Sequence, residues 1–368
     1  MPDIEIGSGK SSRRGYGLDD VAIVPSRRTR DPEDVDLSWR IEGYDFGLPL
    51  VAAASDAVVS PDSAIGIGRA GGLAVLNLEG LWTRYEDPLP LFDEIASLAP
   101  AVSTRRLQEL YSQPVRPDLV TERIRQIALA GVVTCACLSP QRTVQFAKAV
   151  VDAALDLLVI QGTVVSAEHV STRSEPLNLK RFIREYDIPV IVGGCASYPA
   201  ALHLMRTGAV GVLVGVGTGS ASTTWNVLGL GAPHATAIAD AAGARSRHLE
   251  ETGVYVHVIA DGGMSTGGDI AKAIACGADA VMIGSPLAAA SDAPGKGRYW
   301  EAAAAHPTLP RGSLMEVPAR GSLTEILLGP AHAPDGALNL FGALRAAMAM
   351  CGYASVREFH KAEVTVAG

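Results

Sequence analysis

Two short glycine-containing segments, about twenty residues apart, carry the clearest chemical signal in the sequence. They read Ala-Asp-Gly-Gly-Met at 260–264 and Met-Ile-Gly-Ser at 282–285, and each follows an apolar run typical of a buried strand. Backbone N–H groups of such turns, at the carboxyl ends of parallel strands, can hold a phosphate group. One glycine turn by itself is equally explained as a tight turn. Two at this spacing, the first opening with Asp261, predict a phosphate site.

The elements that must position these turns alternate regularly between strand and helix. The predicted strands are Leu48–Ala53, Leu73–Asn77, Val132–Cys137, Leu155–Ile160, Pro189–Val192, Val210–Val214, Tyr255–Ile259 and Ala280–Ile283. The predicted helices are Asp62–Ala70, Leu119–Ala130, Thr143–Ala154, Leu179–Tyr186, Pro199–Thr207, Ala235–Glu251, Asp269–Cys276 and Leu340–Cys351. This count predicts an α/β fold of the (β/α)8 TIM-barrel type, with the phosphate-binding loops after strands 7 and 8, although a doubly wound open sheet shares the local pattern.

The remaining segments lie outside this alternation. Residues 1–47 are interpreted as a mobile polar arm followed by short strands at Gly17–Pro25 and Val35–Ile41, and residues 48–368 as a single barrel domain. Three long loops interrupt the barrel, at 81–117, 215–233 and 293–334. Barrel enzymes place their chemistry on loops at the carboxyl ends of the strands, but the last of these three fits a plain surface excursion equally well.

Composition narrows the class of protein. The 39 acidic and 31 basic residues give a net charge of −8, which argues against nucleic acid or an anionic membrane as partner. No apolar run approaches membrane-spanning length and no export signal opens the chain, so we expect a cytoplasmic protein. The five cysteines follow neither a disulfide framework nor a zinc-site spacing, so we expect buried thiols and no bound metal of that kind.

Together these segments resemble the IMP dehydrogenase and GMP reductase family over nearly the whole chain. The resemblance lies in Gly-Leu-Asp-Asp-Val-Ala-Ile-Val-Pro at 17–25, in the strand at 49–56, in both glycine turns, in the loop at 214–224 and in Glu-Val-Pro-Ala-Arg-Gly at 316–321. The family usually carries a regulatory pair of CBS domains after its second strand. Only the short 81–117 segment occupies that place here, so the resemblance is to the CBS-less branch, whose barrels assemble as tetramers.

The resemblance also implies roles for individual residues. Asp261 would bind the ribose hydroxyls of a purine mononucleotide (IMP, GMP or XMP). The phosphate contacts would come from the loop and the two turns, namely Gly219, Ser220, Gly262, Gly263, Gly284 and Ser285. A carboxylate suits a ribose diol, and glycine-flanked amides suit a phosphate.

The catalytic loop departs from the family at its defining position. Both family reactions use a cysteine thiolate that attacks purine C2, and Ser222 stands in its place. A serine hydroxyl needs an adjacent general base, whereas a thiol ionises near pH ~8.5. No histidine or carboxylate lies within the loop, and His234 is interpreted as incidental to the next helix. Thr224 does match the catalytic threonine of the family, while the position of the reductase glutamate aligns with Arg311.

The dinucleotide site departs as well. An aspartate that ends strand four in the family, and meets the nicotinamide ribose, is replaced by Gln161, followed by Gly162 and Thr163. We therefore expect NAD or NADP binding to be weakened. The Arg-Tyr pair that activates water in the dehydrogenases has no counterpart, since Arg298-Tyr299 lies too close to strand eight. The main-chain carbonyls of Gly217, Gly219 and Ser222 could still surround a monovalent cation.

Three functions remain open from the sequence. The first is an NAD(P)-linked oxidoreductase acting on a purine mononucleotide with altered machinery. The second is a catalytically inactive nucleotide sensor, or a regulatory partner of an active paralogue, because a site that keeps ground-state contacts and loses transition-state groups binds without accelerating. The third is another phosphate-binding barrel enzyme, with FMN in the turns. We also expect a homotetramer, because the apolar segments at Val21–Val24 and Val364–Val366 would need cover.

Overall fold

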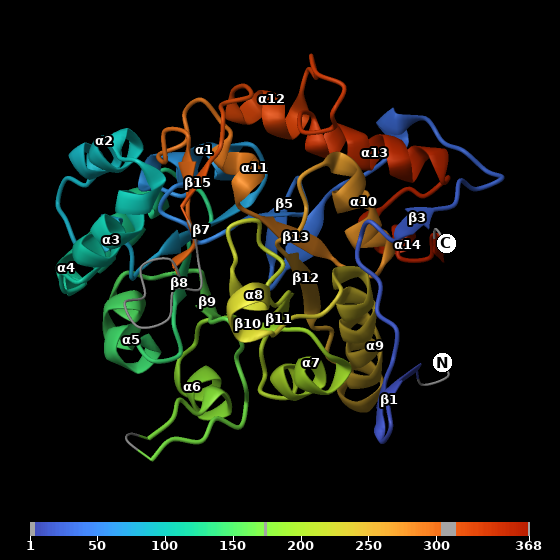
Figure 1. Cartoon of the computed structure of the whole chain (residues 1–368), viewed down its shortest axis with the longest axis horizontal. Helices are drawn as coiled ribbons and strands as arrows, with labels where there is room; N and C mark the ends of the chain where they lie inside the picture. The colour runs from blue at the N-terminus through green and yellow to red at the C-terminus, as the bar shows by residue number, and fades with distance from the viewer. Residues whose placement is uncertain (1–3, 173–174, 303–313, 367–368) are drawn as a thin grey trace.

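The computed structural model describes residues 4–172, 175–302 and 314–366, and its centre is a closed barrel of parallel strands (Figure 1). The barrel strands, in order around the ring, are β6 (Leu50–Ala52), β7 (Leu73–Asn77), β8 (Cys135–Leu138), β9 (Leu157–Gln161), β10 (Val190–Cys195), β11 (Gly211–Val214), β12 (His257–Asp261) and β13 (Ala280–Ile283). β13 pairs with β6, which closes the ring. The predicted TIM barrel is confirmed, and the open-sheet alternative is excluded.

Helices follow the strands and cover the outside of the barrel. They are α1 (Pro61–Arg69), α4 (Pro117–Ala128), α5 (Thr143–Asp152), α6 (Leu179–Glu185), α7 (Tyr198–Met205), α9 (His234–Thr252), α10 (Gly267–Ala275) and α13 (Leu340–Met350). Each lies within a few residues of a predicted helix. Their starts carry chemical signals, since Ser60, Ser197 and Thr266 each cap a helix by accepting a backbone N–H.

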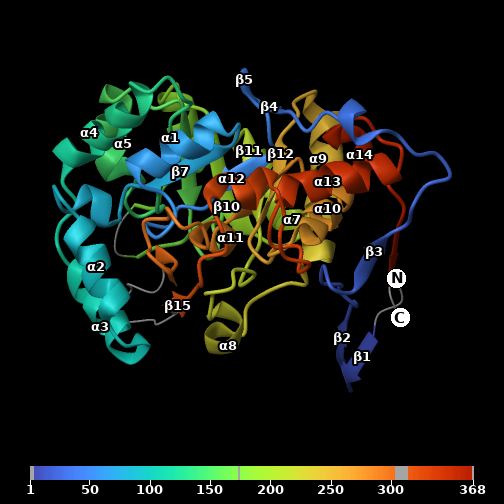
Figure 2. The ribbon, with the colours of Figure 1, turned by 90° about the horizontal axis from the view of Figure 1, so that it is seen from above.

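The barrel is filled by apolar side chains and closed at the amino end by a hairpin. Strand residues that point inward form one cluster with the hairpin of β4 (Trp39–Ile41) and β5 (Tyr44–Phe46). Trp39, Ile41 and Phe46 are buried in this cluster. Figure 2 shows β4 and β5 at one end of the molecule and α8 (Thr224–Leu228) at the opposite end. The amino end is therefore plugged, and a ligand can enter only from the other side.

The predictions for the amino-terminal segment need three corrections. The arm is a hairpin of β1 (Ile4–Gly7) and β2 (Lys10–Ser12), and Arg13 just after it pairs with Asp240 of α9. Of the strand predicted at Val35–Ile41, only β4 forms, and the backbone N–H of Ser38 ahead of it donates to the carboxylate of Asp36. Third, only β3 (Val21–Ile23) forms within the strand predicted at Gly17–Pro25, and it pairs antiparallel with β16 (Val364–Val366). Val366 stays exposed in this pair, and the homotetramer stays a prediction.

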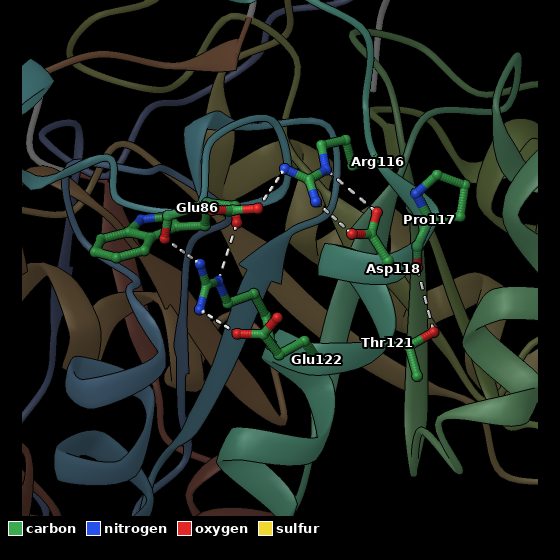
Figure 3. A network of polar contacts seen from close by, with 8 residues as sticks. Glu86, Arg116, Pro117, Asp118, Thr121 and Glu122 are labelled. Atoms are coloured by element: carbon green, nitrogen blue, oxygen red, sulfur yellow. Dashed lines mark hydrogen bonds and ion pairs between the residues drawn. The ribbon is translucent and has the colours of Figure 1, made fainter.

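The segment at 81–117 is mainly helical and was predicted only as a loop. It contains the 3-10 turn η2 (Leu81–Thr83), α2 (Leu89–Ser97) and α3 (Pro100–Tyr111), and it is called here the helical insert. Ion pairs tie its two ends together, because Arg116 lies between Glu86 and Asp118 (Figure 3). Arg123 of α4 binds the carbonyl oxygens of Trp82 and Glu86. The insert is therefore fixed beside the carboxyl end of the barrel.

The other two predicted loops also contain ordered elements. The 215–233 loop holds α8, and the 293–334 segment holds β14 (Arg298–Tyr299), β15 (Met315–Glu316) and α12 (Leu323–Leu328). β14 and β15 pair antiparallel. Among the helices of the described residues, none is long and apolar enough to cross a membrane.

Candidate functional site

A cavity of about 490 Å³ opens at the carboxyl ends of the barrel strands. Its walls come from the ends of β6, β7, β8, β9, β12 and β13, from the loop after β11, from the helical insert and from the segment around β14. These elements are far apart in sequence, so the cavity exists only because the barrel closes. This is where barrel enzymes bind their substrates.

Most of the predicted site residues line this cavity. They are Gln161, Thr163, Gly219, Ser222, Thr224, Asp261, Gly262 and Gly284. Ser220 and Gly263 are solvent-exposed beside it, and Ser285 begins the short helix α11 (Ser285–Ala288) behind Gly284. The structure thus brings the two glycine turns and the 215–233 loop together around one space.

Glycine is required where the first turn meets the loop. Gly262 and Gly263 both have positive φ, +75° and +70°, a region that other residues seldom adopt. A Cβ on Gly262 would lie 2.9 Å from the backbone N of Gly219. The hydroxyl of Thr218 also donates to the carbonyl oxygen of Asp261, at 2.5 Å. The turn and the loop are therefore locked together by close backbone contact.

Asp261 and Glu301 are two carboxyl groups in the same part of the cavity. Asp261 accepts a hydrogen bond from the side-chain amide of Gln161, whose Nε2 is 2.9 Å from Oδ2. Burial raises the pKa of Asp261 to about 7, although this hydrogen bond lowers it. Burial, and then the charge of Asp261, raise the pKa of Glu301 to about 7 as well. The other oxygen of Asp261 remains available to a ligand in the cavity.

The loop that holds Ser222 shows no general base at this serine among the described residues. Ser222 Oγ donates to Thr224 Oγ1 at 3.1 Å, and no described histidine or carboxylate hydrogen-bonds to Ser222. His234 begins α9, where its Nε2 lies 2.9 Å from the carbonyl oxygen of Val214, and burial lowers its pKa. Its other nitrogen faces Gly263. His234 is thus a buried structural histidine, and among the described residues no general base lies in hydrogen-bond contact with Ser222.

Tyr299 and Glu301 are cavity residues that the sequence reasoning missed. Tyr299 is buried, and a Cβ on Gly284 would lie 2.3 Å from its hydroxyl oxygen. Arg298 points elsewhere, to Glu316 and to the carbonyl oxygens of the helical insert. Arg298 and Tyr299 therefore point to different places, and of the two the tyrosine lines the cavity. Arg311, the position aligned with the reductase glutamate, lies outside the described residues.

The opposite wall was also missed, and it carries guanidinium groups. Asn77 ends β7 and Glu79 follows it, while Arg84 belongs to the helical insert. Cys137 lies in β8, and Arg142 follows that strand. Burial, and then the charge of Glu79, raise the pKa of the Cys137 thiol, so it is a poor nucleophile. Only the position of Asn77 at a strand end could have been used to find this wall from the sequence.

The fold and this cavity define a (β/α)8 barrel protein with a ligand site at the carboxyl end of its strands. Residues 15–322 match the domain family described as IMP dehydrogenase / GMP reductase domain. A crystal structure of an IMP dehydrogenase/GMP reductase-like protein from Corynebacterium glutamicum superimposes with a TM-score of 0.95 and 48% identity, covering 99% of this chain and 98% of that one. The chain belongs to the IMP dehydrogenase / GMP reductase family.

The relatives of this chain within the family fall into two groups that differ in their similarity to it. An uncharacterized oxidoreductase of Mycolicibacterium smegmatis is 51% identical over 99% of both chains. One from Mycobacterium tuberculosis is also 51% identical, over 99% of this chain and all of its own length. Inosine-5'-monophosphate dehydrogenase of Methanocaldococcus jannaschii is 25% identical, over 95% of this chain and 92% of its own. The chain is thus much more similar to the uncharacterized oxidoreductases than to this dehydrogenase.

Proposed function

We propose that this protein binds a purine mononucleotide (IMP, GMP or XMP) in the cavity and acts as an NAD(P)-linked oxidoreductase of purine nucleotides. The observation that carries the proposal is the convergence of Asp261, Gly262 and Gly284 with the loop around Ser222 in one cavity. Membership of the family and the naming of relatives about half identical to this chain as oxidoreductases support the reaction class. The volume of about 490 Å³ lies within the range of small-molecule sites.

The residues present suit the parts of such a ligand. The ribose hydroxyls would donate to Asp261, whose charge Gln161 already supports with one hydrogen bond. The phosphate would lie against the turn at Gly284, where the Tyr299 hydroxyl is a further donor. Gln161 and Thr163 line the cavity beside β9, where a nicotinamide ribose would lie in a weakened NAD(P) site. A monovalent cation and a homotetramer remain proposals from the family resemblance alone.

One observation favours a second function, nucleotide binding without catalysis. The Ser222 hydroxyl bonds to Thr224, and no histidine or carboxylate of the described residues bonds to it. A site that keeps its ground-state contacts while lacking the nucleophile would serve as a sensor or as a regulatory partner of an active paralogue. This reading predicts tight binding with no change in NAD(P)H absorbance.

Titration calorimetry with IMP, GMP and XMP tests the shared core of both functions. We expect at least one nucleotide to bind the wild-type protein, and Asp261→Asn to weaken that binding at least tenfold, because a neutral amide accepts the ribose hydroxyls less strongly. Asp292→Asn, an exposed aspartate outside the cavity, is the matched control. Absorbance assays with NAD, NADP and their reduced forms then separate enzyme from sensor. Binding of none of the three nucleotides, or a yellow flavin-containing protein, would overturn the purine assignment.

A further inference from the structure

The wall of the cavity formed by β7, β8 and the helical insert differs in charge from the wall that carries Asp261. Arg84 and Arg142 both line it, and the side-chain hydrogen bonds that they make within the described chain go to neutral oxygen atoms. Burial lowers the pKa of Arg84, nearby acidic groups raise it, Asp56 and Glu79 among them, and the charge of Arg142 lowers it by less. The carboxylates of Asp56 and Glu79 already accept hydrogen bonds from Tyr111, Leu81 and Ser139, so the unused N–H donors of the arginines remain for a ligand anion.

Arg84 is held in place by neutral groups. Its Nε and Nη2 donate to the carbonyl oxygen of Glu79 at 3.1 and 2.9 Å, and its Nη1 donates to the carbonyl oxygen of Gln113. Its guanidinium also lies 5.6 Å from the ring centroid of Tyr111. Three of its five N–H donors are thereby used, which leaves two for a ligand. The position of the charge is fixed before any ligand arrives, so little side-chain entropy is lost on binding.

The side-chain amide of Asn77 is independent evidence for a ligand at this wall, because its buried N–H donor has no acceptor among the described residues. It is 5% exposed and lines the same cavity, and its Nδ2 has no hydrogen-bond partner in the described structure. Its Oδ1 accepts the backbone N–H of Glu79 at 3.0 Å, which fixes the amide orientation. A buried donor without an acceptor is costly, so an acceptor from a ligand is the expected partner. The nearby carboxylate of Glu79 already accepts the N–H of Ser139, at 2.6 Å.

We propose that Asn77, Arg84 and Arg142 form a second subsite, which binds an oxyanion, a phosphate or a carboxylate, of a second ligand. This inference rests on the proposed function, in which the two glycine turns hold the phosphate of the mononucleotide. Guanidinium groups bind such oxyanions through paired N–H donors, and a carboxamide adds one more. The subsite lies on the β7–β8 side of the cavity, away from Gly262 and Gly284. The second ligand is therefore an anionic co-substrate or effector rather than a neutral one.

Binding of inorganic pyrophosphate and of malonate tests this subsite, at constant ionic strength and with saturating IMP present. We expect the wild-type protein to bind at least one of the two, and Arg142→Gln to weaken that binding roughly tenfold, because one charged donor is lost. Arg142 is exposed and its side chain bonds only to Gln145 in the described chain, so this variant should fold normally. Arg184→Gln, an exposed arginine of α6 outside the cavity, is the matched control and should bind as the wild type does.

The two anions and IMP separate the remaining outcomes. Preference for pyrophosphate points to a phosphate-bearing ligand such as a dinucleotide, and preference for malonate points to a small dicarboxylate. Equal binding by Arg142→Gln and Arg184→Gln would overturn the subsite, as would the absence of binding by either anion. Competition between IMP and the anion would also overturn it, because the arginines would then hold the phosphate of the mononucleotide itself. If IMP fails to bind but Arg142→Gln still weakens anion binding, the subsite stands and the purine assignment fails.

Discussion

The two walls of the cavity use different parts of the chain to bind a ligand. The wall at β11–β13, called here the glycine wall, presents backbone groups of glycine turns together with the carboxyl groups of Asp261 and Glu301. The wall at β7–β8, called here the arginine wall, presents side-chain donors from Asn77, Arg84 and Arg142. The first wall depends on close approach of main chain to main chain, which only glycine allows. The second depends on a helical insert that holds an arginine in place.

This difference separates what a substitution does on each side. In the glycine wall, an added methyl group moves the backbone, so stability and binding should fail together. In the arginine wall, removal of a charge leaves the main chain where it is, so binding should fail alone. This difference between the walls would be disproved if substitutions on both sides changed stability and binding together.

The largest expected effect comes from Gly262→Ala. Its φ of +75° strains any other residue, and the new Cβ would lie 2.9 Å from the backbone N of Gly219. Gly253→Ala is the matched control, because its φ is +73° and nothing lies within 4 Å of the added Cβ. We expect Gly253→Ala to cost about 1 kcal/mol of unfolding free energy and Gly262→Ala about 2–4 kcal/mol, with loss of IMP binding. Urea unfolding and calorimetry measure both, and equal costs would show that the turn and the loop are not locked.

Asp261→Asn should have opposite effects on binding and on stability. The folded-state pKa of about 7 lies above the unfolded value of ~3.9, so the folded protein holds more protons between about pH 4 and pH 7. The unfolding free energy of the wild type therefore falls as pH rises through this window. Asparagine removes that loss and keeps the hydrogen bond from Gln161.

Above about pH 7, Asp261→Asn should thus be more stable than the wild type. The full shift corresponds to up to about 4 kcal/mol, and because solvent reaches the cavity we expect nearer 1–2 kcal/mol. Urea unfolding at about pH 5 and about pH 8 measures the difference, with Asp292→Asn as control. A variant less stable than the wild type at the higher pH would show that Asp261 stabilises the fold. The carboxylate would then be explained by stability, without a ligand.

A smaller effect is expected where the helical insert meets the barrel. The Tyr111 hydroxyl donates to the carboxylate of Asp56 and accepts the indole N–H of Trp300 at 2.9 Å. Tyr111→Phe removes both bonds but keeps the ring beneath Arg84, so we expect a loss of about 1–2 kcal/mol in unfolding free energy and no loss of pyrophosphate affinity. Tyr353→Phe, whose hydroxyl bonds at the exposed surface, should change the stability less. A large drop in pyrophosphate affinity would mean that the hydroxyl network, rather than the ring and the carbonyl groups, positions Arg84.

The same contrast explains what could be predicted from the sequence. The strands and the glycine turns leave local patterns, so the barrel and the placement of Asp261, Gly262 and Gly284 around one cavity followed from the residues and from the family resemblance. The arginine wall leaves no such pattern in the sequence, because Arg84 and Arg142 look there like any surface arginines. They come together only when the helical insert folds against the barrel. Tyr299 was set aside because its distance along the chain from β13 was judged too short. Its hydroxyl nevertheless reaches Gly284, because β14 pairs with β15 and turns back over the cavity.

The reactivity of one cysteine thiol in each wall compares the two walls most directly. Cys137 already lies in the arginine wall, where burial raises its pKa, so it should react slowly with iodoacetamide. Ser222→Cys would place a second thiol in the half-buried loop of the other wall, and we expect it to be labelled faster than Cys137 and to be protected by IMP. Peptide mass spectrometry measures both rates, and labelling that IMP does not slow would place the nucleotide away from the loop. If Ser222→Cys also gains NAD-dependent oxidation of IMP, the missing nucleophile alone separates this chain from the family reaction. If it binds IMP without turnover, the side chains around Gln161, where a nicotinamide ribose would lie, must also limit the reaction.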